Sequence, residues 1–220
     1  MHAFVLAGGN SSRMGRDKAT LVVAGQPLIV HALEKLRALD FAPRICGSRP
    51  DLAEYAEVVP DNSPGCGPLA GIEAALSVSD SDLNLFLPVD LPSLPIEFLR
   101  WIVARAEASS SVATIPQVAG RPEPLCAVYS RRLLPGLRES LARGDFKIMA
   151  AIPLAAAALG SAIDEFPVES LAAAMVSPSG SLTLTPADWF RNMNTPDDYD
   201  QVRRSLETNA SGANERHPIS

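Results

Sequence analysis

A glycine-rich loop with several basic side chains lies close to the N-terminus. Residues 5–19 read VLAGGNSSRMGRDKA, so that Gly8 and Gly9 directly follow a short apolar run. Glycines after a buried strand permit positive φ angles and let backbone N–H groups approach an anion or the edge of a base. Arg13 and Lys18 could then neutralise phosphate charge. The loop predicts a nucleotide-binding turn, and the alternative is an ordinary strand-to-helix turn with solvated cations.

The loop matches neither of the two most familiar phosphate-binding fingerprints. The dinucleotide fingerprint requires GxGxxG, whereas the glycines here are Gly8, Gly9 and Gly15. The Walker A pattern requires Gly-Lys-Ser/Thr, but Gly15 is followed by Arg16 and Asp17. The failed GxGxxG pattern disfavours a dinucleotide-dependent dehydrogenase. We also find no recognisable Ser-His-Asp or Cys-His set for nucleophilic catalysis.

Two aspartates stand where predicted strands end. Asp90 terminates the most strand-like run, LNLFLPV, and Asp61 follows EVVP. A carboxylate at the carboxyl end of a strand is well placed to hold Mg²⁺ against phosphate oxygens, which makes Asp90 the candidate metal ligand. The alternative role for each aspartate is that of a helix N-cap.

The elements that must position these residues alternate between strand and helix in the first half of the chain. The predicted strands cover residues 3–7, 44–47, 57–60 and 83–89, and the predicted helices cover 27–39, 51–56, 68–78 and a segment from about Pro95. Residues 20–27 read as a short extended segment and a turn. This alternation predicts an α/β protein, with a parallel sheet covered by helices on both faces and a ligand beyond the carboxyl ends of the strands.

The order of elements is less regular after residue 110. Strand-like runs at 112–118 and 125–130 flank the turn-rich segment AGRPEP, which could form a hairpin or join two strands. Residues 131–160 are expected to be helical, whereas 161–190 give no clear assignment. A further helix is expected after Pro196.

Composition excludes several classes of protein. The chain has 220 residues, of which 47% are hydrophobic, and its net charge of −6 argues against nonspecific binding to nucleic acid or to an anionic membrane. Cys46, Cys66 and Cys126 form no CxxC pair, so neither a zinc cluster nor a redox dithiol is predicted. The N-terminus does not resemble a secretion signal, and no apolar stretch of about 18 residues occurs. We expect a cytoplasmic protein.

Four motifs occur along the chain in the order LAGGNSSRMGRDK, GPLAG, PVDLP and NMNTPDD. Their order and spacing resemble those of the molybdenum cofactor guanylyltransferases, within the wider group of nucleoside-triphosphate transferases. The resemblance covers about residues 3–205. It implies a three-layer sandwich with a mostly parallel sheet, the Rossmann-like fold of nucleotide-diphospho-sugar transferases.

The resemblance also implies how the chain is organised. We expect a single nucleotidyltransferase domain over residues 1–206. Its nucleotide-binding half extends to about residue 110, and its acceptor-binding half covers 111–206. Residues 207–220 lack apolar content and are expected to form a disordered tail.

The resemblance implies site residues position by position. The nucleotide-binding positions are Leu6, Ala7, Gly8, Gly9, Lys18, Cys46, Asp61 and Asp90. Lys18, Arg13 and Asp90 are the catalytic positions: the two cations face the triphosphate, and Asp90 binds Mg²⁺, with Mn²⁺ as a second candidate metal. Cys46 departs from the family pattern, because some members carry an asparagine near the base at this position.

The implied reaction is attack by the terminal phosphate of molybdopterin on the α-phosphorus of GTP, with release of pyrophosphate. The acceptor-binding candidates are Arg121, Lys147, Asn192 and Asn194. The implied partners are GTP and molybdopterin, with transient contact to molybdoenzymes or their chaperones, and with no nucleic acid or membrane. The alternatives are a cytidylyltransferase for the same cofactor, a sugar-phosphate nucleotidyltransferase, and a non-catalytic nucleotide-binding regulator.

Overall fold

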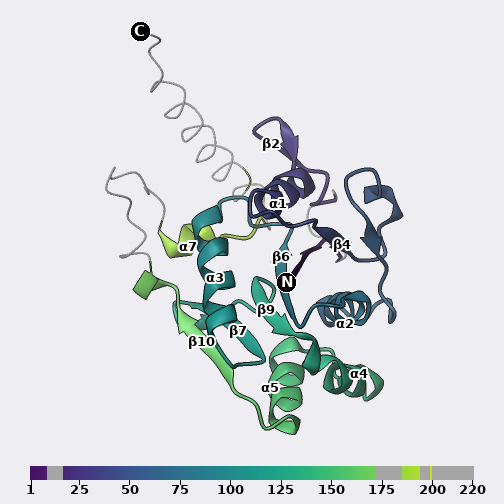
Figure 1. Ribbon diagram of the computed structural model, residues 1–220. Coiled ribbons are helices and arrows are strands. Elements are labelled where there is room, and N and C mark those ends of the chain that lie inside the picture. The colour runs from purple at the N-terminus through teal and green to yellow at the C-terminus, as the bar shows by residue number, and fades with distance from the viewer. Residues whose placement is uncertain (9–16, 172–184, 194–198, 200–220) are drawn as a thin grey trace.

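A twisted, mostly parallel sheet forms the centre of the molecule (Figure 1). The computed structural model describes residues 1–8, 17–171, 185–193 and 199. Along the sheet the strand order is β10 (Ile163–Pro167), β7 (Ala113–Val118), β9 (Ala127–Ser130), β6 (Leu83–Pro88), β1 (His2–Leu6), β4 (Arg44–Cys46) and β5 (Val58–Val59). Neighbouring strands are parallel except at β9, which is antiparallel to both β6 and β7. Four parallel strands, β6, β1, β4 and β5, therefore end at one edge of the sheet.

Helices cover both faces of the sheet. They are α1 (Leu28–Arg37), α2 (Pro68–Val78), α3 (Ile96–Ala108), α4 (Leu134–Ala142), α5 (Ile148–Ala158) and the short α7 (Pro186–Trp189). Side chains of a strand alternate between faces, so Ala3 and Val5 pack with α1, α3 and α7, whereas Phe4 and Leu6 pack with α2, α4 and α5. The predicted three-layer α/β fold is confirmed.

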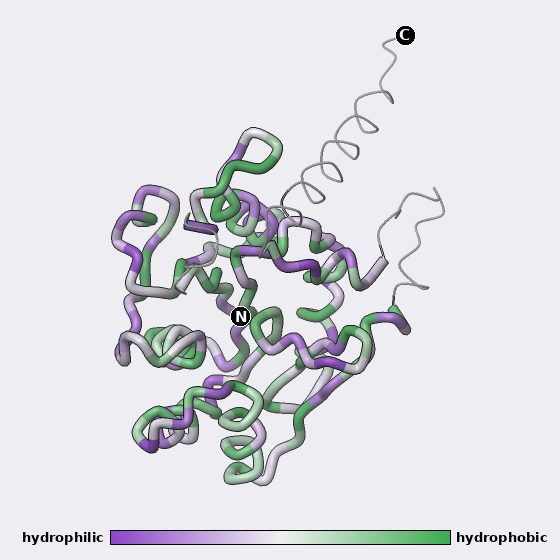
Figure 2. The backbone as a smooth tube through the Cα atoms, turned by 180° about the vertical axis from the view of Figure 1, so that it is seen from behind, coloured by the Kyte–Doolittle hydropathy of each residue, from purple (hydrophilic) through white to green (hydrophobic). Residues whose placement is uncertain are grey.

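The helices α4 and α5 pack unusually closely. A Cβ atom at Gly136 of α4 would lie 2.5 Å from the Cβ atom of Ala155 in α5, which is far inside van der Waals contact. The hydropathy tube shows α5 with almost no hydrophilic residue, beside an α4 of mixed character (Figure 2). Among the described residues, no helix is long and apolar enough to cross a membrane.

Two hairpins agree with the turn signals of the sequence. β2 (Val22–Val23) pairs with β3 (Gln26–Pro27) through a two-residue turn in which both central residues have positive φ. The AGRPEP segment forms β8 (Arg121–Pro122), which pairs with the end of β7, and the chain then returns along β9. Both alternatives expected for this segment, a hairpin and a link between two strands, therefore occur together.

Two expectations about elements differ from the structure. Residues 51–56 form only a single 3₁₀ turn, η1 (Pro50–Leu52), where a helix was expected. Turns over residues 53–55 follow this 3₁₀ turn and lead directly to β5. Residues 161–190, which could not be assigned from the sequence, include the strand β10. Only Phe166 is buried in β10, so the strand lacks a clear alternating pattern. The helix expected after Pro196 and the tail at 207–220 lie outside the described residues.

Candidate active site

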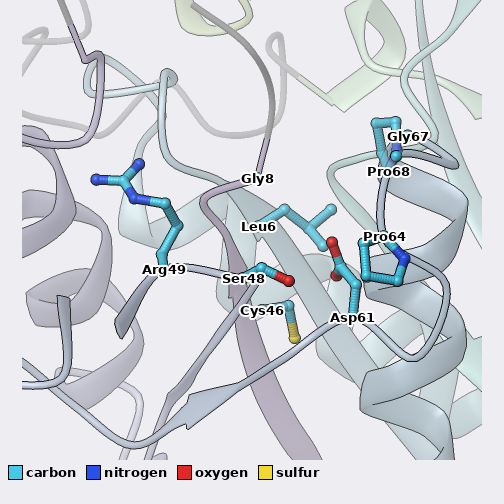
Figure 3. Close-up of a pocket in the computed structure, with 11 residues that line it drawn as sticks. Leu6, Gly8, Cys46, Ser48, Arg49, Asp61, Pro64, Gly67 and Pro68 are labelled. Atoms are coloured by element: carbon cyan, nitrogen blue, oxygen red, sulfur yellow. The ribbon is translucent and has the colours of Figure 1, made fainter. Parts of the chain in front are cut away.

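Two adjoining cavities lie at the carboxyl ends of the parallel strands. The larger has a volume of about 300 Å³, and its wall includes Leu6, Gly8, Cys46, Ser48, Arg49, Asp61, Pro68 and Gly71 (Figure 3). The smaller has a volume of about 160 Å³, and its wall includes Leu6, Ala7, Gly8, Asp17, Lys18, Asp90 and Leu125. Because Leu6, Gly8 and Pro68 line both, one ligand could occupy the two cavities together.

The turns that follow β1 and β4 are locked together through their backbones. The N–H of Ala7 donates to the carbonyl of Cys46 at 3.0 Å, which continues the sheet ladder past the strand ends. Gly47 has a φ of +133°, and a Cβ atom there would lie 3.0 Å from the nitrogen of Gly8. A glycine is therefore required at position 47 for the first turn to pass so close to the second.

Asp61 presents an unsatisfied acceptor to the larger cavity. Its Oδ1 atom is fully buried and has no hydrogen-bond partner among the described residues. Burial raises the pKa of the Asp61 carboxyl above its usual range. Buried polar atoms without partners are rare and indicate that a ligand or ordered water completes them.

Gly71 and Cys46 shape the wall around Asp61. A Cβ atom at Gly71, on the first turns of α2, would lie 3.4 Å from the Cδ2 atom of Leu6 and 3.5 Å from the Oδ1 atom of Asp61. The glycine therefore leaves space in front of the carboxylate. Burial, and secondarily the charge of Asp61, raises the pKa of the Cys46 thiol, so this side chain stays neutral.

An ion pair occupies the smaller cavity. The Nζ atom of Lys18 lies 2.9 Å from the Oδ2 atom of Asp90, and both side chains are largely buried. The N–H of Val89 donates to the carbonyl of Leu6 at 3.2 Å, which fixes the end of β6 against the end of β1. A cation and a carboxylate thus converge beside the glycine turn.

The loop that follows Asp90 is held by a lysine of α1. The Nζ atom of Lys35 donates to the carbonyls of Leu91, Pro92 and Leu94 at distances of 3.2, 2.6 and 2.7 Å. Burial lowers the pKa of Lys35 to about 7, while three carbonyl acceptors favour its charged form. These bonds fix the backbone immediately beyond the Asp90 carboxylate.

The N-cap alternative does not hold for either aspartate. The N-cap residue of α3 is Pro95, and that of α2 is Gly67, with no side-chain cap bond in either case. Asp90 and Asp61 therefore face the cavities without capping the helices that follow them.

The acceptor candidates lie apart from the two cavities. Arg121 is exposed on β8, Lys147 is exposed at the N-cap of α5, and Asn192 is exposed next to the buried Met193. Among the described candidates, none is part of either cavity wall. Three other predicted positions, Gly9, Arg13 and Asn194, lie outside the described residues.

Sequence reasoning missed several residues that the fold brings to this edge, among them Ser48 and Gly71 in the wall of the larger cavity. Asp17 and Leu125 line the smaller cavity, and Arg49 lines the larger. Glu123 lies near enough to Asp90 that, after burial, the charge of Asp90 also raises the pKa of its carboxyl. Two of these residues could have been found from their positions in the sequence. Arg49 follows the end of a predicted strand, and Glu123 belongs to the same GRPEP turn as Arg121.

The fold and the paired cavities define an α/β nucleotide-binding protein, and comparisons specify its class. The MobA-like NTP transferase domain matches residues 3–158. The chain is 32% identical over 208 residues to the molybdenum cofactor guanylyltransferase of Syntrophotalea carbinolica, covering 92% of this chain and 90% of that protein. It therefore belongs to the MobA-like NTP transferase family and is a nucleotidyltransferase.

Solved structures agree with this assignment. The structure of molybdopterin-guanine dinucleotide biosynthesis protein A from Archaeoglobus fulgidus superposes with a TM-score of 0.76 at 26% identity, covering 94% of this chain and all of that one. The 2-C-methyl-D-erythritol 4-phosphate cytidylyltransferase of Thermus thermophilus superposes with a TM-score of 0.62 at 16% identity, covering 93% and 98% of the two chains. The second likeness shows the shared fold alone.

Proposed function

We propose that this chain transfers GMP from GTP to the terminal phosphate of molybdopterin, releasing pyrophosphate and forming a guanine dinucleotide cofactor. The observation that carries the proposal is the unpartnered, buried oxygen of Asp61 in a cavity that adjoins the Lys18–Asp90 pair. The first group can receive a base, and the second can receive phosphates. The names of the relatives support the same substrates.

Guanine suits the Asp61 carboxylate better than cytosine does. Guanine carries two adjacent donors on one edge, N1–H and the exocyclic N2–H, and an ionised carboxylate has two acceptor oxygens. Cytosine places the N3 acceptor beside its N4 donor, so one carboxylate oxygen would face a lone pair. This pairing supports GTP over CTP and assigns the larger cavity to the base.

The smaller cavity suits the phosphates and a divalent cation. Mg²⁺ is commonly held by one or two carboxylates together with substrate phosphates and water. Asp90 supplies such a carboxylate, and no group of three or more His, Cys, Asp or Glu side chains among the described residues forms a cage for a metal. We assign Asp90 as the protein ligand for Mg²⁺ or Mn²⁺, which when bound neutralises phosphate charge. Arg13 and Gly9 are proposed as further contacts to the nucleotide.

The chemistry requires alignment and charge stabilisation more than a protein nucleophile. A terminal phosphate oxygen of molybdopterin forms a bond to the α-phosphorus of GTP, while the bond from that phosphorus to the α–β bridging oxygen breaks. Pyrophosphate leaves with the electron pair of the broken bond. Lys18 stabilises the charge that develops on this leaving group, and the glycine turn and Asp61 hold the nucleotide in line.

We propose that the acceptor approaches over the loop between β8 and β9. Arg121, Lys147, Asn192 and Asn194 are the proposed contacts to the anionic pterin. The finished cofactor would then pass to molybdoenzymes or their chaperones during transient contact in the cytoplasm.

Turnover with defined substrates tests the proposal. Purified protein is incubated with molybdopterin, Mg²⁺ and either GTP or CTP, and pyrophosphate release is measured. We expect release with GTP. If pyrophosphate is released with CTP but not with GTP, the protein is a cytidylyltransferase. If it is released only when a sugar phosphate replaces molybdopterin, the acceptor is a sugar phosphate. If nucleotide binds but no pyrophosphate is released, the protein is a regulator.

A further inference from the structure

Arg49 occupies a position that the proposed reaction does not explain. It lies in the turn after β4, and its guanidinium binds two carboxylates. The Nη1 atom donates to Asp17 at 2.9 Å and Nη2 donates to the other Asp17 oxygen, while Nε and Nη2 donate to Asp51 at 2.9 and 2.6 Å. The Arg49 side chain is 21% exposed, whereas the Asp17 and Asp51 side chains are 35% and 55% exposed.

The Asp17 carboxylate ties Arg49 to the lysine of the site. Asp17 directly precedes Lys18, and its Oδ1 atom also accepts from the N–H of Ala19 at 3.2 Å. The carbonyl of the buried Ala19 accepts from the N–H of Ile29 at 3.0 Å, at the start of α1. The residues on both sides of Lys18 are therefore anchored, Asp17 through its side chain to Arg49 and Ala19 through its backbone to α1.

Arg49 lines the same cavity as Asp61, but its guanidinium is directed away from that carboxylate. In the close-up its side chain extends away from Asp61 and Cys46, although its backbone lies in the same turn as Ser48 (Figure 3). The turn after β4 thus reaches both ends of segment 9–16. Gly47 packs against Gly8 at one end, and Arg49 binds Asp17 at the other.

We infer that Arg49 is a positioning residue: by binding Asp17 it fixes Lys18 opposite Asp90, so that the lysine meets the leaving pyrophosphate. A small displacement of a charged group at a reacting centre can cost a large factor in rate, because alignment supplies much of the acceleration. The effect on turnover rests on the proposed function, whereas the anchoring of Lys18 does not.

The molecule contains a matched control. Asp51 binds the same guanidinium as Asp17 but belongs to the η1 turn, and its side chain is 55% exposed. Asp17→Asn and Asp51→Asn each remove one carboxylate charge from Arg49. Only the first removes the link to Lys18.

Steady-state kinetics of Arg49→Gln, Asp17→Asn, Asp51→Asn and the Arg49→Gln/Asp17→Asn double variant test the inference. We expect the first two to lower kcat by roughly 10- to 100-fold, with a change in KM for GTP of less than about threefold. Asp51→Asn should keep the kcat of the wild type. The double variant should have the same kcat as the less active of the two single variants, because both substitutions break the same Arg49–Asp17 contact. Arg49→Lys should restore part of kcat, since lysine keeps one charged contact.

Losses that multiply in the double variant would overturn the inference, because they would mean that Arg49 acts on the nucleotide directly. An equal loss of kcat in Asp51→Asn would also overturn it.

Hydrogen–deuterium exchange gives a second readout that does not depend on turnover. The N–H of Leu21 donates to the carbonyl of Lys18 at 3.1 Å. We expect faster exchange of the Ala19 and Leu21 amides in Arg49→Gln and Asp17→Asn, and wild-type exchange in Asp51→Asn. If the wild type transfers no GMP but this exchange pattern holds, the proposed function fails and the anchoring stands. Unchanged exchange in all variants, beside normal GMP transfer, would leave the function intact and remove the anchoring.

Discussion

The two ends of the strand order, β6–β1–β4–β5 on one side and β10–β7–β9 on the other, contribute residues to the candidate site in different ways. On one side, β1, β4, β5 and β6 run parallel and end at the same edge, so the residues after each strand meet there. On the other side, the antiparallel β9 sends its end to the opposite edge, and the loop at 119–126 reaches the smaller cavity through Leu125. Strand direction therefore brings the proposed nucleotide residues together, whereas the position of the proposed acceptor residue Arg121 depends on how one loop turns its side chains.

The largest expected effect is on the Lys18–Asp90 pair. Lys18→Met and Asp90→Asn should each lower kcat by about 10²- to 10³-fold, because each removes a charged group that stabilises the departing pyrophosphate or holds the metal. Pyrophosphate release at saturating GTP measures the loss, and circular dichroism checks that the variants are folded. If both variants kept the kcat of the wild type, the parallel side of the sheet would not be the reaction centre.

Base selection at Asp61 should show the next largest effect. Asp61→Asn replaces one acceptor by a donor, which opposes guanine and suits cytosine. We expect the ratio of kcat/KM for GTP to that for CTP to fall by roughly 10- to 100-fold. A ratio equal to that of the wild type would separate Asp61 from base recognition.

The same carboxyl should make GTP binding sensitive to pH. Guanine donors bind the ionised carboxylate, and burial raises the pKa of Asp61 in the free protein. As pH falls through this raised pKa, Asp61 takes up a proton and loses an acceptor, so KM for GTP should rise at a higher pH than for an ordinary aspartate. Asp61→Asn, which does not titrate, serves as the control and should remove this dependence.

Substitutions at two glycines, Gly136 and Gly71, should separate effects on helix packing from effects on nucleotide binding. Gly136→Ala should lower the free energy of unfolding by about 1–3 kcal/mol, because its Cβ atom would collide with Ala155 of α5. Urea unfolding measures this loss, and KM for GTP should not change.

The matched variant Gly71→Ala should do the opposite. Alanine is favoured over glycine inside a helix by roughly 0.5–1 kcal/mol, but its methyl group would enter the space in front of Asp61. Stability should therefore hold or rise while KM for GTP increases severalfold. A destabilised Gly71→Ala protein with normal KM would contradict the assignment of this cavity to the base.

The smallest effect on kinetics is expected from a substitution at Arg121, in the second half of the chain. Arg121 is exposed on β8, and exposed charges contribute little because solvent and salt screen them. Arg121→Ala should raise KM for molybdopterin by about threefold or less and leave KM for GTP unchanged. An increase in KM for GTP instead would move Arg121 from the acceptor to the nucleotide.

The sequence allowed prediction of site residues that lie near the end of a strand. It did not allow prediction of site residues whose role depends on where the side chain points. The family resemblance supplied Leu6, Gly8, Cys46, Asp61, Lys18 and Asp90, and the fold places all of them at the two cavities, beside the ends of the parallel strands. Arg49 could not be distinguished from a solvated arginine, since its role depends on a carboxylate 32 residues away.

The same limit applies to the second half of the chain. The GRPEP turn was singled out, but β8 ends at Pro122 and Glu123 lies in the turn that follows, so the directions of these side chains depend on the turn and not on a strand pattern. β10 was missed because an edge strand with a single buried residue carries almost no periodic signal.

The contact between Gly47 and Gly8 sets how freely two neighbouring positions can vary during evolution. Any side chain at position 47 would push the end of β1 away, so lineages that keep this turn must keep the glycine. At position 46 the backbone bond to Ala7 does not depend on the side chain, which lies in the wall of the larger cavity. We therefore propose that substitutions at position 46 change which base the larger cavity admits while the glycine turn stays in place.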